Sequence, residues 1–153
     1  MDFSAREDIE APIDFVFEQV TDFKAFERSI MRRGGDVQRL HGGDAPVVGT
    51  KWKVKFRLRG KERNVDAQIT EVDAPNKLKI EVTSRNAEGS MVVELVALSP
   101  KRTRVIVSAD AGAKTIPAKL FFQSIRLARA KTSAKFKSLV AGFAEDVEAR
   151  YQA

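Results

Sequence analysis

Hydrophobic residues recur every three or four positions in the last quarter of the chain, residues 115–151. This spacing is that of one face of an α-helix. Thr115 can cap such a helix, Pro117 suits its first turn, and no later proline interrupts the pattern. The sequence therefore predicts one long C-terminal helix with a continuous stripe, made of Phe121, Ile125, Ala128, Thr132, Phe136, Leu139, Phe143 and Val147.

Alternating apolar and polar positions over most of the remaining chain predict β-strands with one dry face. The clearest case is residues 51–59, where one face is apolar from Trp52 to Leu58 and the other is basic throughout. Short connections with turn residues separate the strands, which implies antiparallel pairing because parallel neighbours need long crossovers. The expected strands are 2–11, 37–40, 51–59, 63–71, 77–83, 90–98 and 103–109.

Two short amphipathic helices are expected directly after the first strand. Pro12 suits a first helical turn, and apolar residues follow it at helical spacing. Asp22 can cap a second helix, which Gly34-Gly35 would end. One dry face on each strand and a stripe on the last helix imply a strongly curved antiparallel sheet of about six to seven strands, wrapped around that helix. The sequence thus predicts a single α+β domain over residues 1–153.

The composition narrows the chemistry. The chain of 153 residues has no cysteine, which excludes disulfides, thiolate catalysis and zinc sites built on sulfur. Its single histidine, His41, argues against a Ser-His-Asp triad or a histidine-rich metal site. There is no apolar run long enough to span a membrane, and the first residues lack the pattern of a secretory signal. We therefore expect a cytoplasmic protein with no cofactor and no metal.

Several short motifs occur in an informative order. They are Ile-Glu-Ala-Pro at 9–12, Thr-Asp-Phe at 21–23, Gly-Thr-Lys-Trp at 49–52 and Leu-Ser-Pro at 98–100. With the order of the elements, they resemble the START-like, helix-grip superfamily (SRPBCC), which includes polyketide cyclase/dehydrases, lipid-transfer START domains and pollen-allergen-like proteins. The resemblance implies that sheet and long helix enclose a cavity for hydrophobic or amphipathic molecules. It does not identify a ligand, because unrelated functions share one fold.

The leading hypothesis is a carrier or sequestering protein for a hydrophobic or amphipathic small molecule. Apolar side chains on the dry faces ordinarily fill a core. A sheet curved around one helix, however, has more inner surface than the helix covers, which favours an apolar pocket. The alternative is a polyketide cyclase/dehydrase-type enzyme that acts in the same cavity. The expected ligand-binding residues are Phe26, Met31, Trp52, Phe56, Arg63, Val65, Ile80, Val82, Phe121 and Ile125.

Four charged residues fall on the dry parity of the predicted strands: Glu7, Arg63, Glu71 and Glu94. An ionised group within apolar walls is costly unless it is paired or hydrated. One interpretation is that strand ends or bulges turn these side chains to solvent. The other places Arg63 at the polar end of a cavity as an anchor for an anion or a carbonyl, with Glu7 or Glu94 as its counter-charge. No pair has the spacing of a known acid/base motif.

Basic residues form two groups and give the chain a net charge of +6. Residues 51–63 carry seven positive charges against one glutamate, and residues 114–137 carry seven with no acid. Both can be solvated faces. A third functional hypothesis makes them a docking surface for an anionic membrane, a ribosome or an acidic protein. Nucleic-acid binding is disfavoured because the nearby aromatic residues point inward by their period. We expect a monomer or a homodimer.

Overall fold

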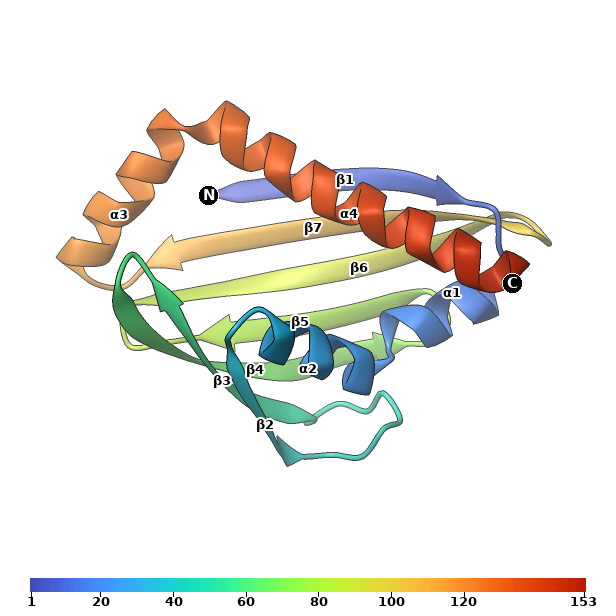
Figure 1. Ribbon diagram of the computed structural model, residues 1–153, viewed down its shortest axis with the longest axis horizontal. Helices are drawn as coiled ribbons and strands as arrows, with labels where there is room; N and C mark the ends of the chain where they lie inside the picture. The colour runs from blue at the N-terminus through green and yellow to red at the C-terminus, as the bar shows by residue number, and fades with distance from the viewer.

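The computed structural model describes residues 1–153. Its main element is a curved sheet of seven strands in the order β1-β7-β6-β5-β4-β3-β2 (Figure 1). Every neighbouring pair is antiparallel, as predicted, and β1 and β2 are the two edges. The strands are β1 (Asp2–Ile9), β2 (Asp36–His41), β3 (Lys51–Leu58), β4 (Lys61–Asp73), β5 (Lys77–Thr83), β6 (Ala87–Ser99) and β7 (Arg102–Ala113).

Two short helices follow β1, which confirms the prediction for this part of the chain. They are α1 (Ile13–Val20) and α2 (Phe23–Arg32). The carboxylate of Asp22 accepts a hydrogen bond from the backbone N–H of Ala25 at 3.2 Å and caps α2. After the end of α2, Gly34 has a φ of 88°, a left-handed conformation that favours glycine.

The C-terminal segment forms two helices: the predicted long helix is present, but it begins at Arg129 instead of near Thr115, and a separate helix precedes it. They are α3 (Ile116–Leu127) and α4 (Arg129–Gln152), which differ in direction (Figure 1). Thr115 caps α3 as predicted and accepts from the N–H of Ala118 at 3.3 Å. The chain bends at Ala128, whose φ of −106° and ψ of 26° lie outside the α-helical region. None of the four helices combines the length and the hydrophobicity that a membrane span requires.

The bend at Ala128 has a tertiary cause. Arg129, the first residue of α4, donates to the backbone carbonyl of Asp2 at 3.1 Å, and its guanidinium lies 5.5 Å from the ring centre of Phe3. The Phe3 ring also lies 6.0 Å from that of Phe136, about two turns further along α4. These contacts hold α4 along β1, whereas α3 packs on β7. A single straight helix could not make both sets of contacts.

The hydrophobic core lies where α1 and α4 cover one end of the sheet. Ile9, Val16, Val105 and Val147 are fully buried there. The predicted stripe of the last helix is right only in part, because Leu139 is 50% exposed and Val140 next to it is buried. The face of α4 that meets the sheet is therefore rotated from the predicted one.

Because of this rotation, we predict that substitutions on the buried and exposed faces of α4 will differ in their effect on stability. Val147→Ala should lower the free energy of unfolding by about 1–3 kcal/mol, because it leaves a cavity at a fully buried position. Leu139→Ala removes a larger side chain but should cost less than about 0.5 kcal/mol, because that position is half exposed. Urea denaturation of both variants provides the measurement. An equal or larger loss for Leu139→Ala would contradict the packing of α4.

Candidate functional site

The strand register determines which side chains face the helices, because alternate residues lie on opposite faces of a sheet. On the helix-covered face, Val107 of β7 lies opposite Val93 of β6, and Val93 lies opposite Leu78 of β5. These three side chains are buried. The same face continues toward the other edge through the following opposed pairs: Ile80 and Met91, Ile80 and Ile69, Val82 and Ala67, Val65 and Val54, Arg63 and Phe56.

The helices leave the middle strands of this face incompletely covered. In the helix–sheet packing α4 lies mainly on β1, α2 on β2, and α1 on the ends of β6 and β7. Phe26 of α2 and Phe143 of α4 meet with ring centres 6.1 Å apart and join the two helices across the face. Apolar side chains of β3, β4, β5 and β6 nevertheless remain partly exposed to water; they include Val54, Phe56, Val65, Ala67, Ile80, Val82 and Met91.

Most of the expected ligand-binding residues border this partly exposed apolar surface. Phe56, Val65, Ile80 and Val82 lie on it by register and are only partly buried. Phe26 is 43% exposed. The other four expected apolar or aromatic residues are on helices or in the core: Met31 is 50% exposed at the end of α2, Phe121 and Ile125 are partly buried on α3, and Trp52 is 6% exposed.

Trp52 is packed between protein side chains and is not open to a ligand. Its ring meets that of Phe23 edge to face, with centres 5.0 Å apart. Its indole Nε1–H donates to the carboxylate of Glu27 at 3.1 Å. Both partners come from α2, so Trp52 fixes that helix to β3.

Arg63 is the charged residue that the structure brings to this surface. It lies on the helix-covered face of β4 opposite Phe56, in line with Val65. Its side chain forms no ion pair within 4.0 Å, and its Nε is buried without a hydrogen-bond partner. A buried donor without a partner is costly, and such groups in native proteins call for an explanation.

The predicted counter-charges do not meet Arg63. Glu7 is on the helix-covered face of β1 opposite Val105, but β7, β6 and β5 separate it from the strand of Arg63. The expectation that Glu94 faces inward is wrong, since it pairs in register with Lys77 on the outer face and is exposed. Along β6, Glu94 lies between Val93 and Leu95, whose side chains are buried on the inner face.

Glu71 is also turned outward, because a β-bulge between Ile69 and Glu71 shifts the parity of β4. Ile69 faces Ile80 on the inner side before the bulge, and Val72 faces Leu78 after it. The side chain of Glu71 then pairs with Lys77 at 3.3 Å on the outer surface. The sequence pattern contained no glycine or other residue that would have revealed the bulge.

A polar cluster beside Trp52 was not predicted. Arg39 of β2 donates to both carboxylate oxygens of Glu27, from Nε at 2.9 Å and from Nη2 at 2.8 Å. Nη1 of Arg39 also donates to Asp44 at 2.9 Å and to the carbonyl of Gly43 at 2.7 Å. The hydrogen bond from Arg39 holds the pKa of Glu27 below its usual range, against the effect of burial, and Trp52 contributes in the same direction. The cluster links α2, β2, β3 and the loop before β3.

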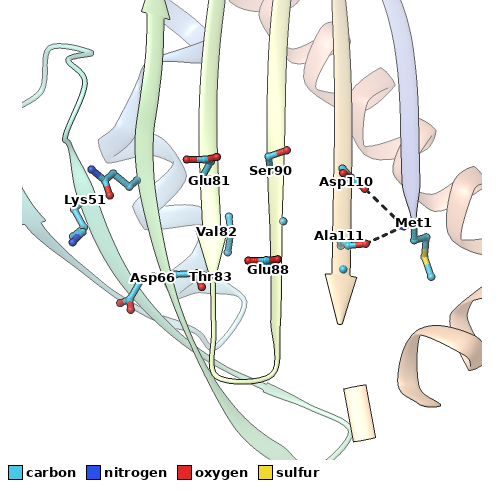
Figure 2. A pocket seen from close by; sticks show the side chains of 13 residues that line it. Met1, Lys51, Asp66, Glu81, Val82, Thr83, Glu88, Ser90, Asp110 and Ala111 are labelled. Atoms are coloured by element: carbon cyan, nitrogen blue, oxygen red, sulfur yellow. Dashed lines mark hydrogen bonds and ion pairs between the residues drawn. The ribbon is translucent and has the colours of Figure 1, made fainter. Parts of the chain in front are cut away.

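The outer face of the sheet carries a broad hollow of about 840 Å³ (Figure 2). Its lining is mainly polar and includes Asp66 of β4, Glu81 of β5 and Asp110 of β7. The N-terminal amine of Met1 closes one side, where it donates to the carbonyl of Ala111 at 2.9 Å and lies 3.7 Å from Asp110. No three acidic or histidine side chains are grouped to hold a metal ion. An open polar hollow of this kind is suited to water, so we place the candidate site on the opposite face.

Comparison with known proteins addresses the fold. No protein-family model and no curated protein matches the sequence. Two solved structures match with a TM-score of 0.71: TTHA0849 from Thermus thermophilus, at 18% identity over 98% of this chain and 99% of that one, and the Zhui aromatase/cyclase from Streptomyces sp. R1128, at 12% identity over 100% and 96%. Ara h 8.0201 matches with a TM-score of 0.60 at 16% identity, over 98% and 96%.

The chain has the START-like helix-grip fold. The match extends over essentially all residues, so the predicted fold is confirmed. Within this helix-grip fold, the partly exposed apolar surface and Arg63 lie on the face of the sheet that the helices cover.

The polar cluster leads to a prediction about stability and pH. Glu27→Gln should lower the free energy of unfolding by roughly 1–3 kcal/mol near neutral pH, because it breaks a charge-assisted pair in which both side chains are largely buried. The pKa of Glu27 is lowered by folding, so its contribution is present above the unfolded pKa and is lost as pH falls through the folded value. The difference between the two proteins should therefore shrink below about pH 4.

Chemical denaturation of both proteins between pH 3 and pH 7 checks this expectation. Glu18→Gln is a matched control, because Glu18 is exposed and makes no ion pair. It should change stability by less than about 0.5 kcal/mol at any pH. A Glu27→Gln effect that persists unchanged at pH 3 would contradict the assigned role of the carboxylate.

Proposed function

We propose that the protein binds a hydrophobic or amphipathic small molecule on the helix-covered face of its sheet. The apolar body of the ligand lies against β3, β4, β5 and β6, and its anionic or carbonyl end meets Arg63. The observation that carries this proposal is the buried, unpartnered Nε of Arg63 at the border of a partly exposed apolar surface.

The apolar surface favours a ligand-binding role for these side chains over the role of a filled core. Side chains such as Phe56, Val65 and Val82 are inward by register, yet water can reach them. Partly exposed apolar area facing inward is a source of binding free energy, because an apolar ligand removes it from water. The partly exposed rings of Phe26 and Phe143, which span the two helices above this face, would add aromatic contact area.

Arg63 favours a ligand that has a hydrogen-bond acceptor at one end. A guanidinium presents several donors in a fixed plane and matches a carboxylate or another planar acceptor. In the free protein no side chain supplies that acceptor, since Arg63 has no ion pair. A carboxylate or carbonyl of a ligand would satisfy the buried Nε and remove its desolvation cost.

The position of helix α3 suggests where the ligand surface ends, close to Arg63. The side chain of Arg59, in the β3–β4 turn, lies 4.6 Å from the ring centre of Phe121 and donates to Ser124 at 3.4 Å. Arg59 has a φ of 53°, which is unusual outside glycine and asparagine and belongs to the tight two-residue hairpin with Gly60. The turn and α3 together would bound the same end of the sheet as Arg63.

Binding is better supported than catalysis. The structural likeness to an aromatase/cyclase is compatible with an enzymatic function, but that likeness concerns the fold alone. General acid/base chemistry needs titratable groups within reach of one reacting centre. Glu7 and Arg63, the two predicted inward charges that remain inward, are on strands separated by three others.

The proposal predicts a preference for an anionic head group that depends on Arg63. Wild-type protein should bind palmitate more tightly than hexadecanol, which has the same chain length without the charge. Arg63→Gln should reduce palmitate affinity roughly tenfold or more, because it removes a charged hydrogen-bond donor, and should leave hexadecanol affinity nearly unchanged. Competition for a fluorescent fatty-acid probe measures both affinities.

Lys55→Gln is the matched control. It makes the same change in net charge next to Phe56, the cross-strand neighbour of Arg63, but its side chain is exposed on the outer face of β3. It should bind both compounds as the wild type does. If neither compound binds wild-type protein, the apolar part of the proposal fails; if Arg63→Gln keeps the palmitate preference, the role of Arg63 fails.

A further inference from the structure

We propose that α3 is a docking element for an anionic lipid bilayer, a role beyond the binding of a small molecule. Its outer side carries an unusual apolar stripe: Ile116 is 73% exposed, Leu120 is 62% exposed and Leu127 is 93% exposed. Steps of four and seven residues bring these side chains to one side of a helix. The opposite side of α3 holds buried Ala118 and the partly buried Ile125.

Two basic residues lie along one side of this stripe. Lys119 and Arg126 are exposed and are displaced from the middle of the stripe by less than a third of a turn. They belong to the stretch 114–137, which has seven basic residues and no acid. An amphipathic helix with apolar side chains next to Lys and Arg is suited to lie in the plane of an anionic membrane surface.

The neighbouring β3–β4 turn extends the positive surface. Arg59 joins it to α3 through Phe121 and Ser124. Exposed Arg57 and Lys61 lie on either side of that turn, and Glu62 is the single acid of the hairpin tip. Two segments far apart in the sequence therefore present positive charge at the same end of the molecule.

A small hollow beside α3 fits a lipid head group. Its volume is about 310 Å³, and it lies between the N-terminus, the end of β7 and α3. Lys119 and Arg126 line it together with apolar Met1, Ala113 and Phe122. Two cations beside apolar side chains match a phosphate with the start of its acyl chains better than they match a fully hydrated acidic peptide.

The charge pattern also argues against a second copy of this chain as the occupant. Face-to-face association of two α3 helices would bring Lys119 and Arg126 of both copies together, without an acid in residues 114–137 to compensate them. An anionic bilayer offers apolar depth for Leu120 and Leu127 and negative charge for the flanking residues. It satisfies both features of the surface.

Vesicle co-sedimentation with the full chain tests the proposal. Wild-type protein should bind vesicles of phosphatidylcholine with 30% phosphatidylglycerol and not vesicles of phosphatidylcholine alone. Binding should weaken when NaCl is raised from 50 to 500 mM, because salt screens the attraction to the surface. The triple variant Ile116→Ser, Leu120→Ser, Leu127→Ser should bind the anionic vesicles roughly tenfold or more weakly, since its apolar contact is lost.

A charge-matched pair of variants separates a specific surface from general attraction. Lys119→Gln with Arg126→Gln should weaken binding roughly tenfold or more. Lys53→Gln with Lys55→Gln lowers the net charge by the same amount, but on the outer face of β3, and should have a small effect. Val47→Ser with Val48→Ser, in an exposed loop, is the control for removal of surface apolar groups.

Three results would overturn the proposal. The first is equal binding of wild type to neutral and anionic vesicles, or to neither. The second is an equal loss for both charge pairs. The third is a concentration-dependent dimer that the Ser variant abolishes, which would make a second copy the occupant of the stripe. Retention on poly-glutamate without vesicle binding would instead indicate an acidic protein partner. Palmitate binding, measured separately, distinguishes failure here from failure of the proposed ligand site.

Discussion

The packing of α4 along β1 determines what the rest of the sheet can do. Phe136 meets Phe3, the guanidinium of Arg129 reaches the backbone of Asp2, and Val147 is fully buried in the core. A helix in this position covers one edge of a seven-stranded sheet and leaves its middle only partly covered. Because the strands keep a dry face across the whole sheet, apolar side chains on β3 to β6 remain partly exposed on the inner side.

Helix α2 closes the other edge, and a polar cluster holds it there. Glu27 accepts from both Arg39 and Trp52, and Phe23 packs against the same indole. Charge-assisted hydrogen bonds of this kind fix geometry more strictly than apolar contacts, since they depend on direction as well as distance. The two edges are thus secured by different interactions. The surface between them is the part of the inner face that a ligand can use.

The bend at Ala128 divides the C-terminal segment into two helices with different roles. Beyond the bend α4 holds the core, and before it α3 spans the end of the sheet between β7 and the β3–β4 turn. With its inner side against the protein, α3 turns Ile116, Leu120 and Leu127 to solvent. This separation allows the proposed ligand surface and the proposed membrane surface to lie on opposite sides of one short helix.

Local patterns in the sequence were enough to predict most elements of the fold, but not the division of the C-terminal segment into α3 and α4. Strict alternation in β3, the caps at Asp22 and Thr115, and the short turns between strands each have a cause within a few residues. Alternation also placed Arg63 and Glu7 on the dry parity, and the strand register puts both on the helix-covered face. The short turns made the antiparallel pairing predictable, and the dry faces of the strands together with the helical stripe made the curved sheet predictable.

Tertiary contacts decided the features that no local pattern contained. The bulge after Ile69 turned Glu71 outward, and the strand register placed Glu94 on the outer face. The stretch around Ala128 consists of good helix formers, so only the competing contacts of Arg129 and α3 explain why the helix bends there. The pairing of Glu27 with Arg39 joins residues from different elements. Sequence determines periodicity over a few residues, whereas the direction and partners of a side chain depend on segments that folding alone brings together.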